Sequence, residues 1–279
     1  MSTSLTLLIF AILSPIFIFI QVMLGFPVAV TGLAIPITQI FQLVASSGVI
    51  FATYTLVVFS YLRKCARMSG MVLLLLIVST GLLGVFGLGQ GVHFAANSLS
   101  YFIITNRIVG ELRAITDFYD EKLSHLIWLP SVILFPATFA AWELVWSPGT
   151  GGSLAAQKSN IMVTADHGRP EPNHRSNHRG WGQGLDQEKK WWWAVGGLGS
   201  WYGVLIGLAS LEAQLAKPIA LPLAITSLLV LGMLTVINKR TIFTPGWTFA
   251  LASNSWLILT VTGWYLRFRG FPEPIGVLF

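Results

Sequence analysis

Apolar residues in this chain come in blocks of about twenty, and this block length constrains the fold more than any other feature. The first block, residues 5–24, contains no charged side chain. A helix needs about 20 apolar residues to cross a hydrocarbon core that is about 30 Å thick. Only 10% of all residues are charged, whereas a soluble domain has about 25%. We therefore expect an integral, multi-pass membrane protein.

The succession of these blocks predicts an all-α fold, a transmembrane helix bundle that forms a single domain over residues 1–279 and crosses the membrane about seven times. Residues 147–190 are the one long polar segment, rich in Gly, Asn, His, Arg and Pro and without helical periodicity, so we predict a loop there. The predicted spans are about 5–24, 38–62, 70–102, 118–146, 191–215, 218–237 and 246–266.

The positions of Lys and Arg predict the orientation of this bundle. Basic residues gather in three connectors, at 63–67, 147–190 and 239–240. With seven spans these connectors lie on one side of the membrane, and basic loops favour the cytoplasm. We therefore expect a cytoplasmic N-terminus and a cytoplasmic polar loop. Topology accounts for the formal net charge of +6, so we expect the lipid bilayer, and not nucleic acid, as the partner of these charges.

Polar side chains inside predicted spans gather at one place, the end of the third span and the start of the fourth. Each set recurs every three or four residues, which puts it on one face of a helix. The short connector at 106–116 predicts antiparallel neighbours, so both faces lie at one depth, near the non-cytoplasmic side. The first set is Gln90, His93, Asn97 and Ser100, and the second is Asp117, Asp120, Glu121, Ser124 and His125.

These side chains are suited to a metal centre. Glu121 and His125 are one helical turn apart, as two ligands of one metal ion often are, and His93 lies opposite them as a third ligand. Nitrogen and carboxylate ligands suit zinc or iron, and three protein ligands leave a position open for water. Without a metal, the same groups would perform acid–base chemistry.

The predicted site has both ligating and supporting residues. Asp117 or Asp120 would orient a histidine or accept a proton, with Asn97 in support. The predicted metal ligands are His93, Glu121 and His125. The predicted catalytic residues are His93, Asn97, Asp117, Asp120, Glu121 and His125.

Three functions are compatible with this pattern. The first is a membrane-embedded enzyme of lipid metabolism acting on a lipid or other hydrophobic small molecule, by metal-dependent hydrolysis or else as an isomerase or oxidoreductase. The second is a proton- or cation-coupled transporter, and the third is a non-catalytic subunit of a membrane complex. A purely structural role stays open as well, because acids stabilise helix N-termini and polar groups bond across helix interfaces.

Glycines on the fifth predicted span form a ridge at a spacing of four residues. Small residues at this spacing let two helix backbones approach closely. We therefore expect a helix-packing partner along this face. The ridge consists of Gly199, Gly203 and Gly207.

About seven spans with buried His and Asp resemble, in outline, the membrane hydrolases related to alkaline ceramidases and adiponectin receptors. That family carries histidine ligands in its last span. Residues 246–266 of this chain contain no histidine, so no residue is carried over. The resemblance implies a metal site that faces lipid.

Overall fold

The computed structural model describes residues 3–23, 47–65, 68–105, 110–146, 180–238 and 244–271, and within them every regular element is helical, as predicted. Two π-helical segments, η2 (Phe118–Ser124) and η3 (Ala216–Ala220), lead into the α-helices that follow them. The α-helices are α1 (Thr3–Met23), α3 (Gly48–Leu62), α4 (Gly70–Thr105), α5 (Glu111–Asp117), α6 (His125–Trp146), α8 (Gly180–Glu212), α9 (Leu221–Asn238) and α10 (Pro245–Phe268).

Within the described residues, 4 helical segments are long and apolar enough to cross a membrane. α1 and α3 contribute shorter apolar stretches, and α10 covers the predicted span 246–266 with a more polar composition. Many large apolar side chains on these helices are exposed, as a lipid-facing surface requires. The long segments are Gly70–Ser100, Glu111–Val145, Trp193–Leu211 and Ala216–Val236.

Two helices, α4 and α8, are longer than one crossing of a bilayer core requires. α4 has 36 residues, about 54 Å at 1.5 Å per residue, which exceeds one bilayer core. α8 begins at Gly180, so the prediction of a loop as far as residue 190 is wrong for residues 180–190. Residues 182–190 are mostly good helix formers, and hydropathy marks where an apolar window begins, not where the helix begins. The predicted loop residues 147–179 lie outside the described residues.

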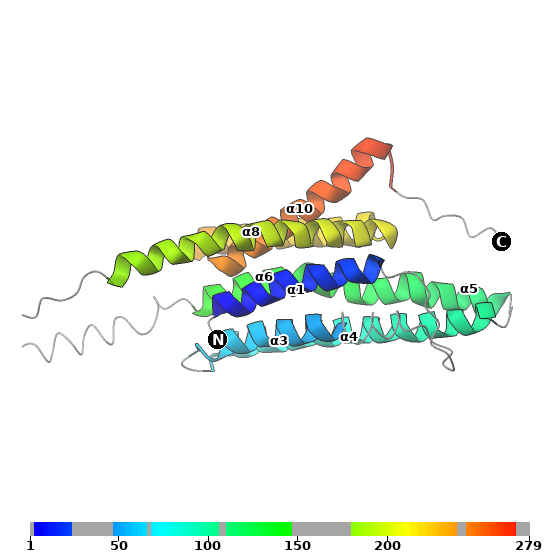
Figure 1. The fold of residues 1–279 in the computed structure, drawn as a ribbon, viewed down its shortest axis with the longest axis horizontal. Coiled ribbons are helices and arrows are strands. Elements are labelled where there is room, and N and C mark those ends of the chain that lie inside the picture. The colour runs from blue at the N-terminus through cyan, green and yellow to red at the C-terminus, as the bar shows by residue number, and fades with distance from the viewer. Residues whose placement is uncertain are drawn as a thin grey trace, which may run out of the picture.

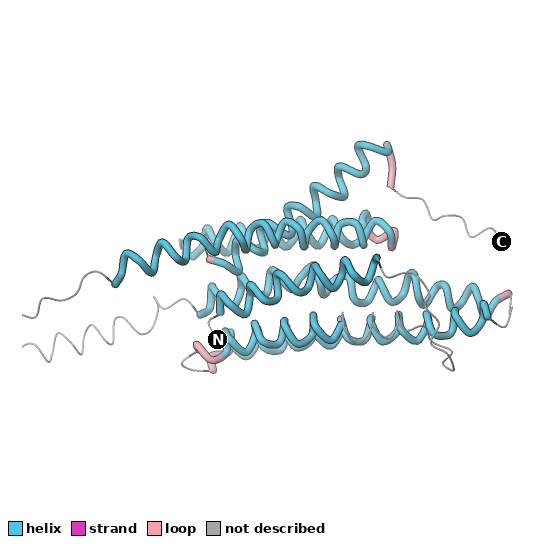
Figure 2. The backbone as a smooth tube through the Cα atoms, viewed as in Figure 1, coloured by secondary structure: helices cyan, strands magenta, loops and turns pink. Residues whose placement is uncertain are grey.

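Most helices pack side by side with long axes roughly aligned, while α10 is inclined to them and diverges from α8 toward its C-terminal end (Figure 1). α3 and α4 lie along one side, α1 and α6 in the middle, and α8 with α10 along the other side (Figures 1 and 2). α4 packs along α6 and continues past the ends of α1 and α8, where α5 and η2 return beside it. The end of α4 and the start of the next helical segment are therefore antiparallel neighbours.

Aromatic side chains fill the middle of the bundle. Phe10 of α1 contacts rings from four other helices, with centroid distances between 5.1 Å, to Phe139, and 6.5 Å, to Phe135. The Phe139 contact is edge-to-face, an arrangement that stabilises ring pairs beyond their area burial. The other rings around Phe10 belong to Tyr54, Tyr202 and Phe249.

A buried carboxylate joins three elements at one end of this core. Glu143 of α6 accepts hydrogen bonds from the backbone N–H of Gly246 at 2.9 Å and of Trp247 at 3.1 Å, which are at the start of α10. The Tyr61 hydroxyl of α3 donates to the same carboxylate at 2.9 Å. A carboxylate at a helix N-terminus satisfies orphan N–H groups and interacts favourably with the helix dipole. Glu143 thus fixes α10 against α3 and α6.

The glycine ridge of α8 faces α10 of the same chain. A Cβ at Gly199 would lie 2.9 Å from the carbonyl oxygen of Phe249, and one at Gly207 would lie 2.9 Å from the Cβ of Thr260. A Cβ at Gly203 would overlap the carbonyl group of Ser253. Backbone contact along the ridge explains why α8 and α10 form the most extensive helix pair in the described part.

Replacing Gly203 by alanine is expected to lower the free energy of unfolding by about 3 kcal/mol, because the obstructing atoms are backbone and do not rotate away. The measurement is the thermal or denaturant midpoint in detergent. Gly197→Ala is the matched control, since a Cβ there meets nothing within 4 Å in the same helix. Equal stability of the two variants would mean that α8 and α10 do not approach as described.

Candidate functional site

The candidate site lies where α4 passes η2 and the start of α6. Gly89 makes the close approach possible, because a Cβ there would lie 2.7 Å from the backbone nitrogen of Trp128 and 3.0 Å from the carbonyl oxygen of Ser124. Any larger residue would separate the two helices about one turn before His93. The glycine therefore sets the distance across which the polar side chains meet.

His93 lies between a carboxylate and an amide. Its Nδ1 is 2.7 Å from Oδ1 of Asp120, across the interface between α4 and η2. Its Nε2 is 3.1 Å from Nδ2 of Asn97, one turn further along α4. The side chains of His93 and Asp120 are only 17% and 10% exposed. With the Asn97 amide donating, Nε2 is the basic nitrogen of the ring, so Nδ1 carries the proton. Nδ1 lies against the Asp120 carboxylate as a close ion-pair contact, without the angles of a hydrogen bond.

His125 is held by the main chain of Asp120. Its Nδ1 is 3.2 Å from the Asp120 carbonyl oxygen and 3.2 Å from the Ser124 hydroxyl. The Ser124 hydroxyl itself donates to that carbonyl oxygen through a short bond. With Nδ1–H donating, Nε2 is again the basic nitrogen. Asp120 thus orients both imidazoles, His93 through its side chain and His125 through its backbone.

The π-helical geometry of η2 explains this double role. A π-helix closes its hydrogen bonds between residues i and i+5, where an α-helix closes them between i and i+4. Asp120 and His125 are five residues apart, so one π-turn puts them on the same side of the segment. π-helical turns are frequent at functional sites. An α-helix at this point would rotate His125 away from the Asp120 carbonyl group.

The two imidazoles contact each other. Their ring centroids are 5.4 Å apart with an interplanar angle of 81°, an edge-to-face arrangement. On its other side, His125 lies 5.4 Å from the ring of Trp128, which is buried. Two histidines, one carboxylate and one amide therefore form a partly buried group, and the Trp128 ring packs against His125.

Not every predicted site residue joins this group. Asp117 pairs with Arg113 at 3.8 Å, and its side chain is 41% exposed. The side chain of Glu121 lies outside the described residues. Gln90 is buried one turn before His93 and accepts a hydrogen bond at 2.9 Å from Ser47, at the start of α3. The structure thus brings together His93, Asn97, Asp120 and His125.

A metal ion would need a third protein ligand here. Among the residues whose side chains are described, no group of three or more His, Cys, Asp and Glu is arranged to hold a metal ion. His93 and His125 provide two basic nitrogens. Nδ1 of His125 bonds the Asp120 carbonyl oxygen and Nδ1 of His93 lies beside the Asp120 carboxylate, the two kinds of partner that metal-ligating histidines use. Predicted ligation by Glu121 stays a prediction.

Three features were missed by sequence reasoning, namely the π-turn, the role of the Asp120 backbone and the role of Glu143. No residue pattern in the sequence predicts the π-turn, and no pattern in the sequence indicates that the Asp120 carbonyl oxygen binds a histidine. The role of Glu143 was also missed, although an acid near the end of an apolar span and a Pro-Gly helix start at 245–246 are the signals that suit such a cap.

Comparisons with protein-family models, with curated proteins and with solved structures each return no match for this chain.

Proposed function

We propose that the protein is an integral membrane enzyme that hydrolyses a lipid or another hydrophobic substrate. The observation that carries this proposal is the orientation of two imidazoles by one residue, Asp120, in a partly buried group. Buried ionisable residues in a membrane helix are costly and are usually retained for function. Seven spans with a cytoplasmic N-terminus, and a site near the opposite face, complete the proposed topology.

In this proposal His93 is the general base. Its Nε2 removes a proton from water as the water oxygen attacks the carbonyl carbon of an ester or amide. The carboxylate of Asp120, 2.7 Å from Nδ1, stabilises the imidazolium that forms. The imidazolium then returns the proton to the leaving group as the carbon–oxygen or carbon–nitrogen bond breaks. When water binds Nε2, the Asn97 amide gives up its hydrogen bond to this nitrogen. The amide is then available to bind the substrate.

A metal-dependent form of the same reaction uses the same residues. Zinc or iron bound by the Nε2 atoms of His93 and His125, with Glu121 as the third ligand, would lower the pKa of a bound water to about 7. Asp120 would then be the partner that orients both ligating histidines. Metal analysis of the purified protein distinguishes the two forms, because only the second loses metal when His125 is replaced by alanine.

Transport of protons or cations is the weaker alternative. A relay needs polar groups across the whole bilayer, whereas the aromatic cluster around Phe10 and Phe139 separates the candidate site from Glu143. His125 and Glu143 are at opposite ends of α6, about 27 Å apart along the helix axis. An ion flux through proteoliposomes that requires His93, without any hydrolysis, would favour transport.

The test of the proposed function uses Asp120→Asn, which keeps the shape of the side chain and removes its charge. Turnover of ester- and amide-linked lipids in vesicles is expected to fall by about 10- to 100-fold, the usual loss when the partner of a functional histidine is changed. Ser98→Ala is the control, because the Ser98 hydroxyl bonds only the backbone of its own helix at Phe94 among the described contacts. Full turnover in Asp120→Asn would overturn the mechanism.

A further inference from the structure

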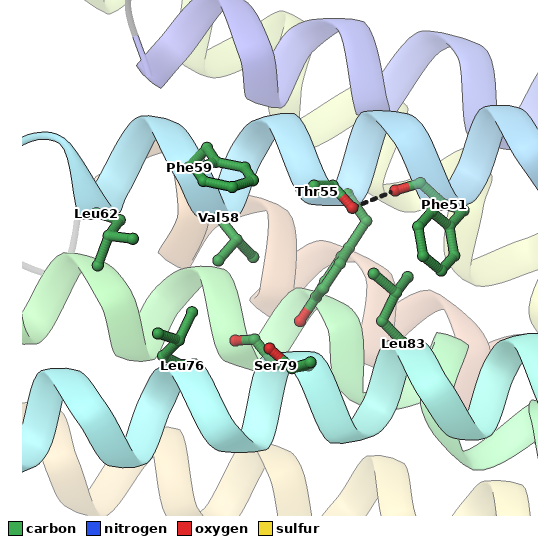
Figure 3. Close-up of a pocket in the computed structure, with 10 residues that line it drawn as sticks. Phe51, Thr55, Val58, Phe59, Leu62, Leu76, Ser79 and Leu83 are labelled. Carbon is green, nitrogen blue, oxygen red and sulfur yellow. Dashed lines mark hydrogen bonds between the residues drawn. The ribbon is translucent and has the colours of Figure 1, made fainter.

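A cavity of about 250 Å³ opens between α3 and α4, apart from the candidate site (Figure 3). Its walls are almost entirely apolar. Figure 3 shows Phe51, Val58 and Leu62 of α3 opposite Leu76 and Leu83 of α4. Tyr54, Thr55, Phe59, Ser79 and Thr80 complete the lining.

Three of the four hydroxyl groups in the wall have partners within the protein, and the fourth belongs to Thr80, an exposed residue at the mouth. The Tyr54 hydroxyl shares a hydrogen bond of 2.9 Å with Thr138, and the Thr55 hydroxyl donates to the carbonyl oxygen of Phe51 at 2.8 Å (Figure 3). Ser79 accepts from the indole N–H of Trp142 at 3.1 Å. Because most hydroxyl groups of the wall already have partners, the cavity favours a hydrocarbon occupant over a polar one.

The cavity opens on a surface suited to lipid. Phe51 and Phe59 flank it on α3 and are 47% and 54% exposed. On α4, Leu76 and Leu83 belong to the segment Gly70–Ser100, which is long and apolar enough to cross a membrane. An occupant therefore enters sideways from the acyl-chain region, and not from water.

The cavity begins about one leaflet thickness away from the candidate site along α4. Leu83 and His93 are ten residues apart on α4, about 15 Å along the helix axis. One leaflet contributes about half of a 30 Å hydrocarbon core, which is also about 15 Å. Leu83 is the α4 lining residue nearest to His93, so a chain whose carbonyl group lies level with His93 reaches the near end of the cavity at Leu83. A chain that extends further enters the cavity toward Leu76.

From this agreement we propose that the cavity binds one hydrocarbon chain of a bilayer lipid, the chain of the substrate itself. This assignment deepens the proposed function and rests on it for the identity of the substrate. The binding of a chain follows from the walls and the opening alone. The cavity accordingly selects a lipid by the length of its chain, while the histidine group acts on its polar end.

The test is photo-crosslinking with a phosphatidylcholine that carries a diazirine near the end of one acyl chain. The protein is reconstituted in vesicles, irradiated and digested, and the labelled peptides are mapped by mass spectrometry. Labels are expected in residues 51–62 and 76–83, at about fivefold or greater excess over residues 225–236 of α9, which also carry exposed apolar side chains but do not line the cavity.

Filling the cavity should remove this excess. Thr80→Trp adds bulk at the mouth, where Thr80 is exposed, and Leu76→Phe narrows the interior as a second, milder variant. Val78→Trp is the matched control, because Val78 is 41% exposed on the same helix and does not line the cavity. Equal labelling of α4 and α9, or equal loss in Thr80→Trp and Val78→Trp, would overturn the assignment.

A further variant, His93→Gln, separates this proposal from the proposed function. Labelling of the cavity in a wild-type protein that hydrolyses no lipid would support chain binding and refute the enzyme. Labelling that persists in His93→Gln, together with loss of the hydrolysis that the wild-type protein shows, would support both proposals. Hydrolysis that depends on His93, with no excess of label in the cavity, would support the enzyme and refute the chain site.

Discussion

Loss of the His93 imidazole is expected to lower lipid turnover by about 10²- to 10⁴-fold, the range that a positioned general base contributes. The reason is that Nε2 of His93, next to Asn97, is the basic nitrogen of the ring, while Nδ1 lies against the Asp120 carboxylate. His93→Gln and His93→Ala should both show this loss, because an amide is no base at neutral pH. Turnover of vesicle-embedded lipids and the melting temperature in detergent are measured for both.

The pair of variants separates chemistry from folding. In His93→Gln the introduced side chain keeps an N–H group that can donate to Asp120, so this variant should stay within about 1 kcal/mol of the wild-type stability. Alanine leaves a buried carboxylate without its partner, and His93→Ala should be less stable by about 1–3 kcal/mol. A folded His93→Gln protein with wild-type turnover would remove His93 from the reaction.

Loss of the Glu143 carboxylate is expected to give a large loss of stability, about 3–5 kcal/mol for Glu143→Ala. The substitution strips three buried donors of their acceptor, namely the Tyr61 hydroxyl and the N–H groups of Gly246 and Trp247. It also removes the negative charge at the start of α10. The measurement is the denaturant or thermal midpoint, together with proteolysis near residues 244–247.

Two comparisons make this result specific. Tyr61→Phe removes one of the donors and should cost about 1–2 kcal/mol. Glu111→Ala is the control, since Glu111 is an exposed acid in the first turn of α5 and should cost less than about 1 kcal/mol. If Glu143→Ala were no more harmful than Glu111→Ala, the carboxylate would not hold α10 in place.

The class of the protein and most helix positions follow from the length of its apolar blocks. This works because hydrocarbon leaves a spanning backbone few options other than the helix. The same reasoning misplaces the start of α8, since the polar helix formers at residues 187–190 continue the helix beyond its apolar part. Hydropathy also ranks α10 below the other long helices, because its buried face includes Ser253 and Asn254.

The membership of the candidate site was predictable only in part. Helical periodicity correctly groups His93 with Asn97 and indicates that α4 and the next helical segment meet. It cannot separate Asp117 from Asp120, because both fit an α-helical stripe. The separation arises from η2, which periodicity does not reveal, and from the ion pair that Asp117 forms with Arg113 four residues earlier.

Because Asp120 holds His93 with its carboxylate and His125 with its peptide oxygen, an alanine scan would record only half of its contribution. No genetically encoded side chain can delete an amide carbonyl. His125 therefore keeps its hydrogen bond to the carbonyl oxygen of residue 120 in every variant at this position. The contribution of this hydrogen bond to the orientation of His125 is measurable by chemical synthesis, for example when an ester or thioamide replaces the peptide bond between residues 120 and 121.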